Sequence, residues 1–418
     1  MMSVLQVFRE VDGTAQLIGF IKEAAGEAGF FYDETYAEDS AAVAVSSSLP
    51  LAGGGLAPAF FEGLLPEGAR RGLYASALHL DSSDWISVLD GLNSDSVGAL
   101  LVSSGNGCSI EVGQDGEDVS DDLLASFSLR PQKTAFELGM ATRLSLAGAQ
   151  SKLGLRNTTG SWESGWQTPV GFSASTHILK TDDGTFPSQT INEALCLSAA
   201  AACGLDVAES KVISPGGKPI LVVRRFDRAV LGDSRQVRRL HQEDFCQARG
   251  FWSTMKYEPT DGHYANLGAM LIAKASSNPF GDRVAFFESL VFDYLIGNCD
   301  NHLKNKSFLW STDWKGRSFA PLYDLTCTTI YPGLDTTMGI GLSPEREISS
   351  VTFDSILATA GNVGVPKMIA AGIVRDLQKK LPDALSDAAS HLAREGYDGA
   401  RAIADEIIGN AAPRCGLR

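Results

Sequence analysis

The sequence predicts an α+β protein in which strands dominate the first half of the chain and helices dominate the second. Up to about residue 226, short apolar runs alternate with polar or glycine-containing turns, which is the pattern of strands. Beyond residue 239, apolar residues recur at helical spacing, most strongly in residues 283–297. The chain has 418 residues, 44% of them hydrophobic, enough for an extensive core divided among two or three units.

Charge and cysteine content narrow the classes of function. The 35 Lys and Arg residues against 50 Asp and Glu residues give a net charge of -15, which argues against a surface that binds nucleic acid by itself. The 7 cysteines are odd in number and include no Cys-x-x-Cys pair, so we expect reduced thiols. These observations fit a cytoplasmic protein that contacts DNA only through a basic partner.

No segment resembles a targeting or membrane-spanning sequence. Residues 1–13 lack the basic stretch and apolar core of a secretory signal. The most apolar stretches, such as residues 194–202 and 368–374, are far shorter than the roughly 20 residues that cross a bilayer. We therefore expect neither export nor a transmembrane helix.

Residues 1–130 are expected to form a mixed N-terminal unit. Apolar residues in segment 56–80 recur at helical spacing. The acidic, small-residue stretch 113–122 suits an exposed connection, which places the first boundary near Pro131. Strand-like runs precede the helical segment at residues 17–21, 30–32 and 42–45.

Residues 131–238 are expected to form a sheet-rich lobe. The strand-like runs 153–156 and 176–180 flank a region of turn residues and indicate a small antiparallel sheet. A glycine ends the helical segment 192–204, and residues 219–226 include an apolar run typical of a buried strand. A helical lobe, residues 239–418, follows with amphipathic segments at 283–297, 366–380 and 383–394.

The most informative segment is the polar loop 297–305, which directly follows an apolar helical pattern. In isolation it could be an ordinary solvated loop. Asp300 and Asn305, however, are five positions apart, as in the catalytic loop of protein kinases. In that loop the aspartate accepts the proton of the substrate hydroxyl and the asparagine binds Mg²⁺.

A second metal-binding carboxylate is expected at Asp324. Kinases need one because Mg²⁺ prefers oxygen ligands and bridges the β- and γ-phosphates. Two strand-like pieces, residues 307–310 and 317–320, precede Asp324, and a hairpin between them would return the chain beside Asn305. The alternative interpretation is an ordinary turn aspartate.

Lys180 and Glu193 complete the set of groups that phosphoryl transfer requires. Lys180 ends a strand-like run and Glu193 begins the next helix, where it could orient the lysine that holds the α- and β-phosphates. A single lysine at a strand end is usually only solvated. The order lysine, glutamate, catalytic loop and metal aspartate is nevertheless that of protein kinases.

Residues 145–152 are a weaker candidate for a phosphate-binding loop. Their small side chains would let backbone N–H groups approach phosphates closely. The segment matches neither the Walker pattern nor the glycine-rich loop of protein kinases.

Taken together, these blocks resemble the HipA family of bacterial toxin kinases along nearly the whole chain. Such an ordered set of matches is difficult to obtain by chance. Five blocks match in the kinase part, residues 145–150, 176–180, 239–246, 297–305 and 321–324, and three match before it, residues 30–33, 64–68 and 95–99.

This resemblance implies an N-terminal α/β subdomain attached to a bilobal protein-kinase-like fold. Residues 1–130 would be the subdomain, 131–238 a sheet-rich N-lobe and 239–418 an all-helical C-lobe. The resemblance also implies an ATP- and Mg²⁺-dependent serine/threonine protein kinase whose cleft lies between the lobes.

Site residues follow from the same resemblance. Asp300 would be the catalytic base, Asn305 and Asp324 would hold Mg²⁺, and Glu193 would orient Lys180. Adenine would lie near the backbone of residues 224–226, although Arg224 replaces a glutamate frequent in the family. The implied ATP-binding residues are Ala147, Gly148, Ala149, Gln150, Ser151, Lys152, Lys180, Arg224, Arg225, Phe226, Asp300, His302 and Asp324. The individual roles of His302 and Lys304 are left open.

Ser145 corresponds to the position at which family members autophosphorylate, which ejects the phosphate loop and disables the kinase. Adding a charge of about -1.5 to -2 beside the ATP phosphates would disfavour nucleotide binding. The family implies a HipB-like helix-turn-helix antitoxin that contacts operator DNA, and an aminoacyl-tRNA synthetase, notably the glutamyl enzyme, as substrate. Two alternatives are a non-catalytic co-repressor and a kinase acting on a small molecule or an unrelated protein.

Overall fold

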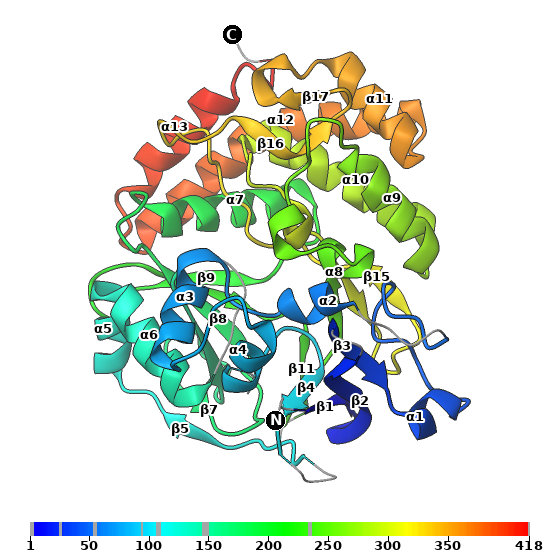
Figure 1. Cartoon of the computed structure of the whole chain (residues 1–418). Coiled ribbons are helices and arrows are strands. Elements are labelled where there is room, and N and C mark those ends of the chain that lie inside the picture. The colour runs from blue at the N-terminus through cyan, green and yellow to red at the C-terminus, as the bar shows by residue number, and fades with distance from the viewer. Residues whose placement is uncertain are drawn as a thin grey trace.

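The computed structural model describes residues 4–24, 27–52, 57–92, 95–105, 110–143, 150–232 and 236–416. It has the expected α+β architecture (Figure 1). A helical lobe occupies the top of the view, a six-stranded sheet with flanking helices the lower left, and a smaller N-terminal sheet the lower right.

The N-terminal unit is an antiparallel sheet of order β3-β2-β1-β4 packed against short helices. Phe30, Phe60 and Phe61 are fully buried in its core. The strands are β1 (Leu5–Val11), β2 (Thr14–Ala24), β3 (Glu27–Tyr32) and β4 (Leu100–Ser103), and the helices are α1 (Glu34–Glu38), α2 (Pro58–Glu62), α3 (Gly68–Ala77) and α4 (Trp85–Gly91).

The prediction of a strand at residues 42–45 was wrong. Backbone groups of this segment form hydrogen bonds with tyrosine hydroxyls and not with a neighbouring strand. The Tyr36 hydroxyl donates to Val43 O and accepts from Val43 N–H, and the Tyr32 hydroxyl accepts from Val45 N–H. Because these partners come from other segments, local sequence pattern could not reveal them.

The sheet-rich lobe is a six-stranded antiparallel sheet of order β5-β7-β6-β8-β10-β9 with a helix layer on each face. Leu153, Leu179 and Val222 pack against α5 and α6, whereas Leu221 and Val223 pack toward α7. The elements are β5 (Gly116–Asp118), α5 (Asp121–Leu129), α6 (Pro131–Thr142), β6 (Lys152–Asn157), β7 (Trp166–Pro169), β8 (His177–Thr181), α7 (Gln189–Cys203), β9 (Ser210–Ile213) and β10 (Ile220–Arg224).

This sheet confirms the expected antiparallel strands and the helix that ends at Gly204. Gly204 has φ +98°, the left-handed conformation that glycine adopts without strain. Strand β5 and helix α5 precede residue 131 but belong to this sheet and its covering layer. The division at residues 130 and 238 stays a prediction.

The C-terminal lobe is helix-rich, and the expectation that it is all-helical was wrong. It contains two small antiparallel sheets, β13-β14-β15 and β16-β17. The elements after β10 are β11 (Arg228–Leu231), β12 (Gln236–Arg239), β13 (Gln242–Asp244), α8 (Phe245–Arg249), η1 (Ser253–Met255), α9 (Tyr264–Ala275), α10 (Pro279–Ile296), η2 (Leu303–Asn305), β14 (Ser307–Trp310), β15 (Arg317–Phe319), β16 (Thr337–Leu342), β17 (Glu345–Glu347), η3 (Ile348–Ser350), α11 (Phe353–Val363), α12 (Lys367–Arg394) and α13 (Ala400–Ala411).

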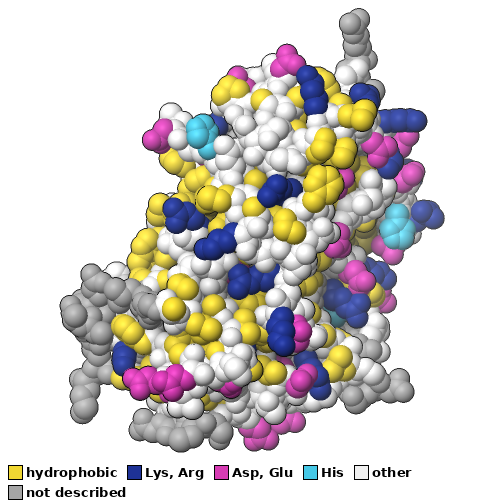
Figure 2. Space-filling view, turned by 90° about the vertical axis from the view of Figure 1, so that its right-hand side faces the viewer, with side chains coloured by type: hydrophobic (Ala, Val, Ile, Leu, Met, Phe, Trp, Pro, Cys, Tyr) yellow, Lys and Arg dark blue, Asp and Glu magenta, His cyan; other side chains and the backbone are white. Residues whose placement is uncertain are grey.

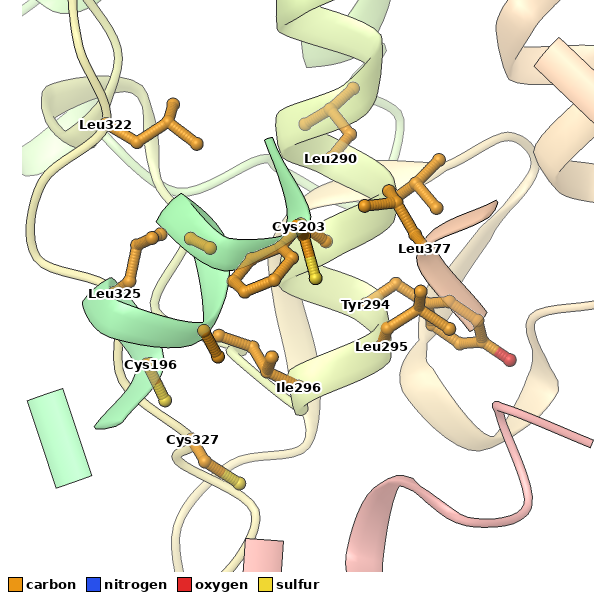
Figure 3. Close-up of a cluster of buried hydrophobic side chains, with 14 of the residues drawn as sticks. Cys196, Cys203, Leu290, Tyr294, Leu295, Ile296, Leu322, Leu325, Cys327 and Leu377 are labelled. Carbon is orange, nitrogen blue, oxygen red and sulfur yellow. The ribbon is translucent and has the colours of Figure 1, made fainter. Parts of the chain in front are cut away.

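The core of this lobe lies where α7, α10 and α12 meet (Figure 3). Leu290 and Leu295 of α10 and Leu377 of α12 are buried there beside Cys203 of α7. The two expected segments 366–380 and 383–394 form the single helix α12, with Pro382 inside it. Proline removes one helical hydrogen bond, and the buried apolar face of α12 continues across the position.

The charges on the surface and the state of the cysteines are consistent with the amino-acid composition. On the face in Figure 2, acidic and basic side chains are both present with apolar side chains between them. The cysteines of the described part are all free and buried. Within the described ranges, no helix combines the length and apolar character needed to span a bilayer.

A buried ion network joins the N-terminal unit to the sheet-rich lobe. Asp95, from the loop before β4, lies 2.9 Å from Arg228, 3.1 Å from Arg239 and 3.2 Å from Arg225. Arg239 also pairs with Glu10 of β1 at 2.9 Å. Because isolated buried charges are costly, this mutual pairing fixes the N-terminal unit against the segment that follows β10.

Candidate active site

Lys180, Glu193 and Asp324 meet between the two lobes. Lys180 lies on β8, and its Nζ is 2.7 Å from Glu193 Oε1 on α7. The same Nζ donates a hydrogen bond to Asp324 Oδ1. Lys180 and Glu193 are buried, whereas the Asp324 side chain is 37% exposed and therefore reachable from solvent.

The electrostatics of this cluster favour the charged forms of Lys180 and Asp324, whereas burial raises the pKa of Glu193. Burial alone would raise the pKa of Asp324, but the Lys180 and Lys152 cations outweigh it and hold that pKa below its usual range. Burial likewise opposes the charge of Lys180, yet Asp324 and Glu193 raise its pKa. The site thus holds a cation between two carboxylates, as in the lysine–glutamate pair of kinases.

The catalytic-loop candidate begins where α10 ends. Gly297 caps the helix at φ +79°, a conformation that favours glycine. Asn298 Oδ1 accepts from the Asp300 N–H at 3.1 Å, and Asn305 Nδ2 donates to the Asp300 carbonyl at 2.9 Å. These bonds fix the loop backbone, while the Asp300 side chain remains 54% exposed.

Tyr257 is a site residue that sequence reasoning missed. Its hydroxyl donates a hydrogen bond to Asp300 Oδ1, and its ring lies edge-on to His302 at 5.1 Å between centroids. Lys256 O accepts from the Leu303 N–H at 3.1 Å and so fastens this segment to the catalytic loop. No local pattern marks Tyr257, because it is 43 residues from Asp300 in the chain.

Asp300 has an environment suited to a proton acceptor. Burial raises its pKa, and the nearby Asp324 carboxylate adds to that effect. The hydrogen bond from Tyr257 opposes them by stabilising the carboxylate. A general base is most effective when its pKa approaches the working pH, so a raised pKa suits proton abstraction.

The hairpin of β14 and β15 brings Asp324 toward the catalytic loop, as expected. The two strands are antiparallel, and the Tyr323 hydroxyl donates to the Lys304 carbonyl at 2.7 Å. Asp324 itself has φ +52°, a left-handed conformation uncommon for aspartate. Tertiary contacts hold this turn, because the chain just before it pairs with Val207.

His302 and Lys304 take different positions. His302 is buried, with Nε2 3.8 Å from Asp300 Oδ1, and burial lowers its pKa well below the usual range. Lys304 points away from the site: its Nζ lies 2.8 Å from Asp244 Oδ2 and 3.0 Å from the Gly63 carbonyl. Lys304 therefore joins the catalytic loop to the N-terminal unit.

Part of the expected phosphate loop lies outside the described residues, namely Ser145, Ala147, Gly148 and Ala149. Ser151 and Lys152 are described and buried. In the sheet register Lys152 on β6 is directly opposite Lys180 on β8. The Gln150 carbonyl accepts a hydrogen bond from Arg70 of the N-terminal unit.

The expected hinge, residues 224–226, stays a prediction. The Arg224 N–H donates to Glu209 O at 2.8 Å, and the Arg225 N–H donates to Thr176 O at 2.9 Å. The Arg225 guanidinium is engaged in the buried ion network, so a nucleotide contact at Arg225 would have to come from its backbone, as expected for a hinge. Phe226 lies closer to the site, with its ring 5.5 Å from that of Tyr323.

The described residues fit a magnesium ion held jointly with phosphates. Asp324 offers carboxylate oxygens, and Asn305 keeps its side-chain carbonyl oxygen because its Nδ2 donates to Asp300 O. No group of three or more His, Cys, Asp or Glu side chains within the described ranges forms a separate metal site. Mg²⁺ is commonly bound by one or two carboxylates together with substrate phosphates and water.

Comparisons with known proteins extend over nearly all of the chain. The profile of the HipA-like C-terminal domain matches residues 144–385, and that of the HipA N-terminal domain matches residues 10–103. The chain is 34% identical to Y4mE of Sinorhizobium fredii over 412 residues, 94% of each chain. It is 28% identical to the serine/threonine-protein kinase toxin HipA of Shewanella oneidensis over 258 residues, 59% of this chain and 57% of that one.

A solved structure shares the fold. The structure is that of the Shewanella oneidensis toxin–antitoxin complex of HipA, HipB and operator DNA. A chain of that structure superposes with a TM-score of 0.82 at 22% identity, covering 99% of this chain and 98% of that one.

Proposed function

The chain belongs to the HipA family, and on that premise we propose that it is an ATP- and Mg²⁺-dependent serine/threonine protein kinase of the toxin type. The observation that carries the proposal is the meeting of Lys180, Glu193 and Asp324 in one ion-paired cluster. These residues come from β8, α7 and the segment after β15, and kinases use the same three chemical groups together.

Each group has a defined task in the proposed reaction. Lys180, oriented by Glu193, binds phosphate oxygens of ATP. Asp300 accepts the proton of an acceptor hydroxyl while that oxygen bonds to the γ-phosphorus, and the bond from this phosphorus to the bridging oxygen breaks to release ADP. Asn305 and Asp324 would hold Mg²⁺, which neutralises phosphate charge when it is bound.

The backbone around Asp300 supports its role as the base. Asn298 and Asn305 hold the loop from both sides, so the carboxylate remains exposed at a fixed position. Fixed positioning matters because an aspartate displaced by about 1 Å could lose much of its catalytic effect. Tyr257 contacts one carboxylate oxygen, Oδ1.

Further parts of the proposal rest on the family. We propose that Ser145 is autophosphorylated and that this inactivates the kinase. A HipB-like antitoxin would bind the protein and contact operator DNA, since HipA of Shewanella oneidensis is in a complex with HipB and its operator. The favoured substrate is an aminoacyl-tRNA synthetase in the cytoplasm, notably the glutamyl enzyme, whose inhibition would arrest growth and produce persistence.

The test is mass spectrometry of the purified protein after incubation with Mg²⁺ and ATP. The unmutated protein should gain phosphate on Ser145, and Asp300→Ala should gain none. Asp313→Ala is the matched control, because Asp313 is an exposed turn aspartate that contacts Ser311.

Three outcomes would decide against the proposal or part of it. Full phosphorylation of Asp300→Ala would exclude Asp300 as the base. Absence of both ATP binding and phosphate transfer in the unmutated protein would favour the non-catalytic co-repressor. If the protein phosphorylated small molecules or unrelated proteins in a cell extract but no aminoacyl-tRNA synthetase, only the proposed substrate would be wrong.

A further inference from the structure

We propose that Arg70 of the N-terminal unit binds the terminal phosphates of the nucleotide, so that the nucleotide site is completed by both parts of the chain. The proposal rests on the proposed kinase function and adds a residue that neither the motifs nor the family profiles assign. Three observations support it: a pair of facing lysines, the environment of Arg70, and a small hollow lined by Arg70 and Lys152.

The first observation is a cationic pair inside the sheet. Lys152 and Lys180 are directly opposite on neighbouring antiparallel strands, so their side chains emerge on the same face. Both residues are less than a tenth exposed. Like charges in this arrangement repel, and the cost rises with burial. Asp324 and Glu193 offset part of the repulsion, and a polyphosphate bound between the two lysines would be attracted by both.

The second observation concerns Arg70, in the first turn of α3. Its Nη1 donates to the carbonyl of Gln150, two residues before Lys152. Within the described ranges no carboxylate forms an ion pair with Arg70, whereas the adjacent Arg71 lies 2.8 Å from Glu62 Oε1. Burial lowers the pKa of Lys152 to about 8; Asp324 opposes this shift, and the nearby cations Lys180 and Arg70 add to it.

The third observation is a small hollow between α3, α6 and the start of β6. Arg70, Tyr74, Lys152, Leu153 and Gly154 are among the residues that line it. Lys152 borders this hollow, and its charge also interacts with that of Asp324. A guanidinium presents several N–H donors in a planar fork that matches phosphate oxygens.

The segment before Arg70 explains how the residue is positioned. Glu67 pairs with Lys256 at 2.7 Å, and Lys256 O accepts from the Leu303 N–H of the catalytic loop. Residues 67–70 of the N-terminal unit therefore make two contacts. Arg70 binds Gln150 of the expected phosphate loop, and Glu67 binds Lys256, which is bonded to the catalytic loop. This arrangement fixes Arg70 relative to both lobes.

The test compares variants of the full-length protein that differ in charge at position 70. Dissociation constants for Mg²⁺–ATP, Mg²⁺–ADP and adenosine are measured by calorimetry for Arg70→Gln and Arg70→Lys. Loss of a charge-assisted contact should weaken Mg²⁺–ATP binding by about tenfold or more in Arg70→Gln, while adenosine binding is unchanged. Arg70→Lys should lose less ATP affinity than Arg70→Gln, because it keeps the charge but not the planar fork of donors.

Arg71→Gln is the matched control, since Arg71 is the next residue on α3 and pairs with Glu62. Its ATP affinity should equal that of the unmutated protein. Equal ATP affinities in Arg70→Gln and the unmutated protein would overturn the inference. Equal losses in Arg70→Gln and Arg70→Lys would also overturn it, because Arg70 would then act only through its bond to Gln150.

A second measurement needs no variant, should a substitution prevent folding. Hydrogen exchange of the unmutated protein should slow in residues 68–77 on addition of Mg²⁺–ATP but not of adenosine. Unchanged exchange with ATP would contradict the role of Arg70. Failure of the unmutated protein to bind Mg²⁺–ATP at all would instead contradict the proposed function itself, so the two failures are distinguishable.

Discussion

Lys180 of β8 donates a hydrogen bond to Glu193 of α7, with 2.7 Å between Nζ and Oε1. Both residues are buried, and Lys180 also contacts Asp324 from the other lobe. Lys180 is thereby held at a fixed position at the boundary between sheet and helical lobe. Such a charge-assisted hydrogen bond limits the motion of Lys180, so its removal should change the rate of phosphoryl transfer.

Replacing Glu193 by glutamine should slow phosphoryl transfer. The variant keeps the shape of the side chain but loses its charge, and a hydrogen bond to a charged group contributes about 1.5–3 kcal/mol. The rate should fall by about tenfold to a hundredfold. Glu163→Gln is the control, because Glu163 is 65% exposed and pairs with Lys211 at 2.8 Å. Equal steady-state rates in the two variants would contradict an orienting role for Glu193.

Replacing Tyr257 by phenylalanine should change the pH dependence of the reaction. The Tyr257 hydroxyl stabilises the charged form of Asp300 and so lowers its pKa. Removal of the hydroxyl should raise that pKa and move the acidic limb of the kcat/KM profile to higher pH. Tyr264→Phe is the control, since the Tyr264 hydroxyl bonds to the Met255 carbonyl. An unmoved limb in Tyr257→Phe would mean that this hydrogen bond does not act on the base.

Replacing Asp95 by asparagine should destabilise the protein strongly. The buried network contains three arginines, Arg225, Arg228 and Arg239, and three carboxylates, Asp95, Asp227 and Glu10. Loss of one carboxylate leaves an unbalanced buried positive charge, which costs about 3–5 kcal/mol. Urea unfolding measures the change. Asp12→Asn, at a surface pair with Arg238 where Asp12 is 73% exposed, should change stability by less than about 1 kcal/mol.

Acid should destabilise the protein through His241. Burial lowers the pKa of His241 from 6.5 to about 3, and the hydrogen bond that Nε2 donates to Val45 O at 2.7 Å opposes this effect only in part. Between these pH values the unfolded chain binds the proton and the folded chain does not, so stability falls as pH is lowered. The loss is about 1.4 kcal/mol per pH unit for one proton.

His241→Gln should reduce this slope, because glutamine retains a donor but does not titrate in this range. The free energy of unfolding would be measured in urea at several values between pH 7 and pH 4. His391→Gln is the control, since His391 is exposed on α12. An unchanged slope in His241→Gln would show that other groups cause the acid sensitivity.

Sequence pattern by itself determined much of the scaffold. The strand that carries Lys180, the helix that carries Glu193 and the hairpin before Asp324 were each predicted from local periodicity and turn residues. The spacing of Asp300 and Asn305 indicated a catalytic loop of the kinase type. In the structure the Asn305 side chain hydrogen-bonds the Asp300 carbonyl.

Only tertiary structure decided which side chains face the site. Tyr257 reaches Asp300, Lys304 turns to Asp244, and Arg225 joins a network centred on Asp95. The single helix α12 and the missing strand at residues 42–45 likewise depend on packing partners elsewhere in the chain. Periodicity reports which face of an element is apolar, whereas the direction of a polar side chain depends on which distant groups can neutralise or hydrogen-bond it after the lobes have packed.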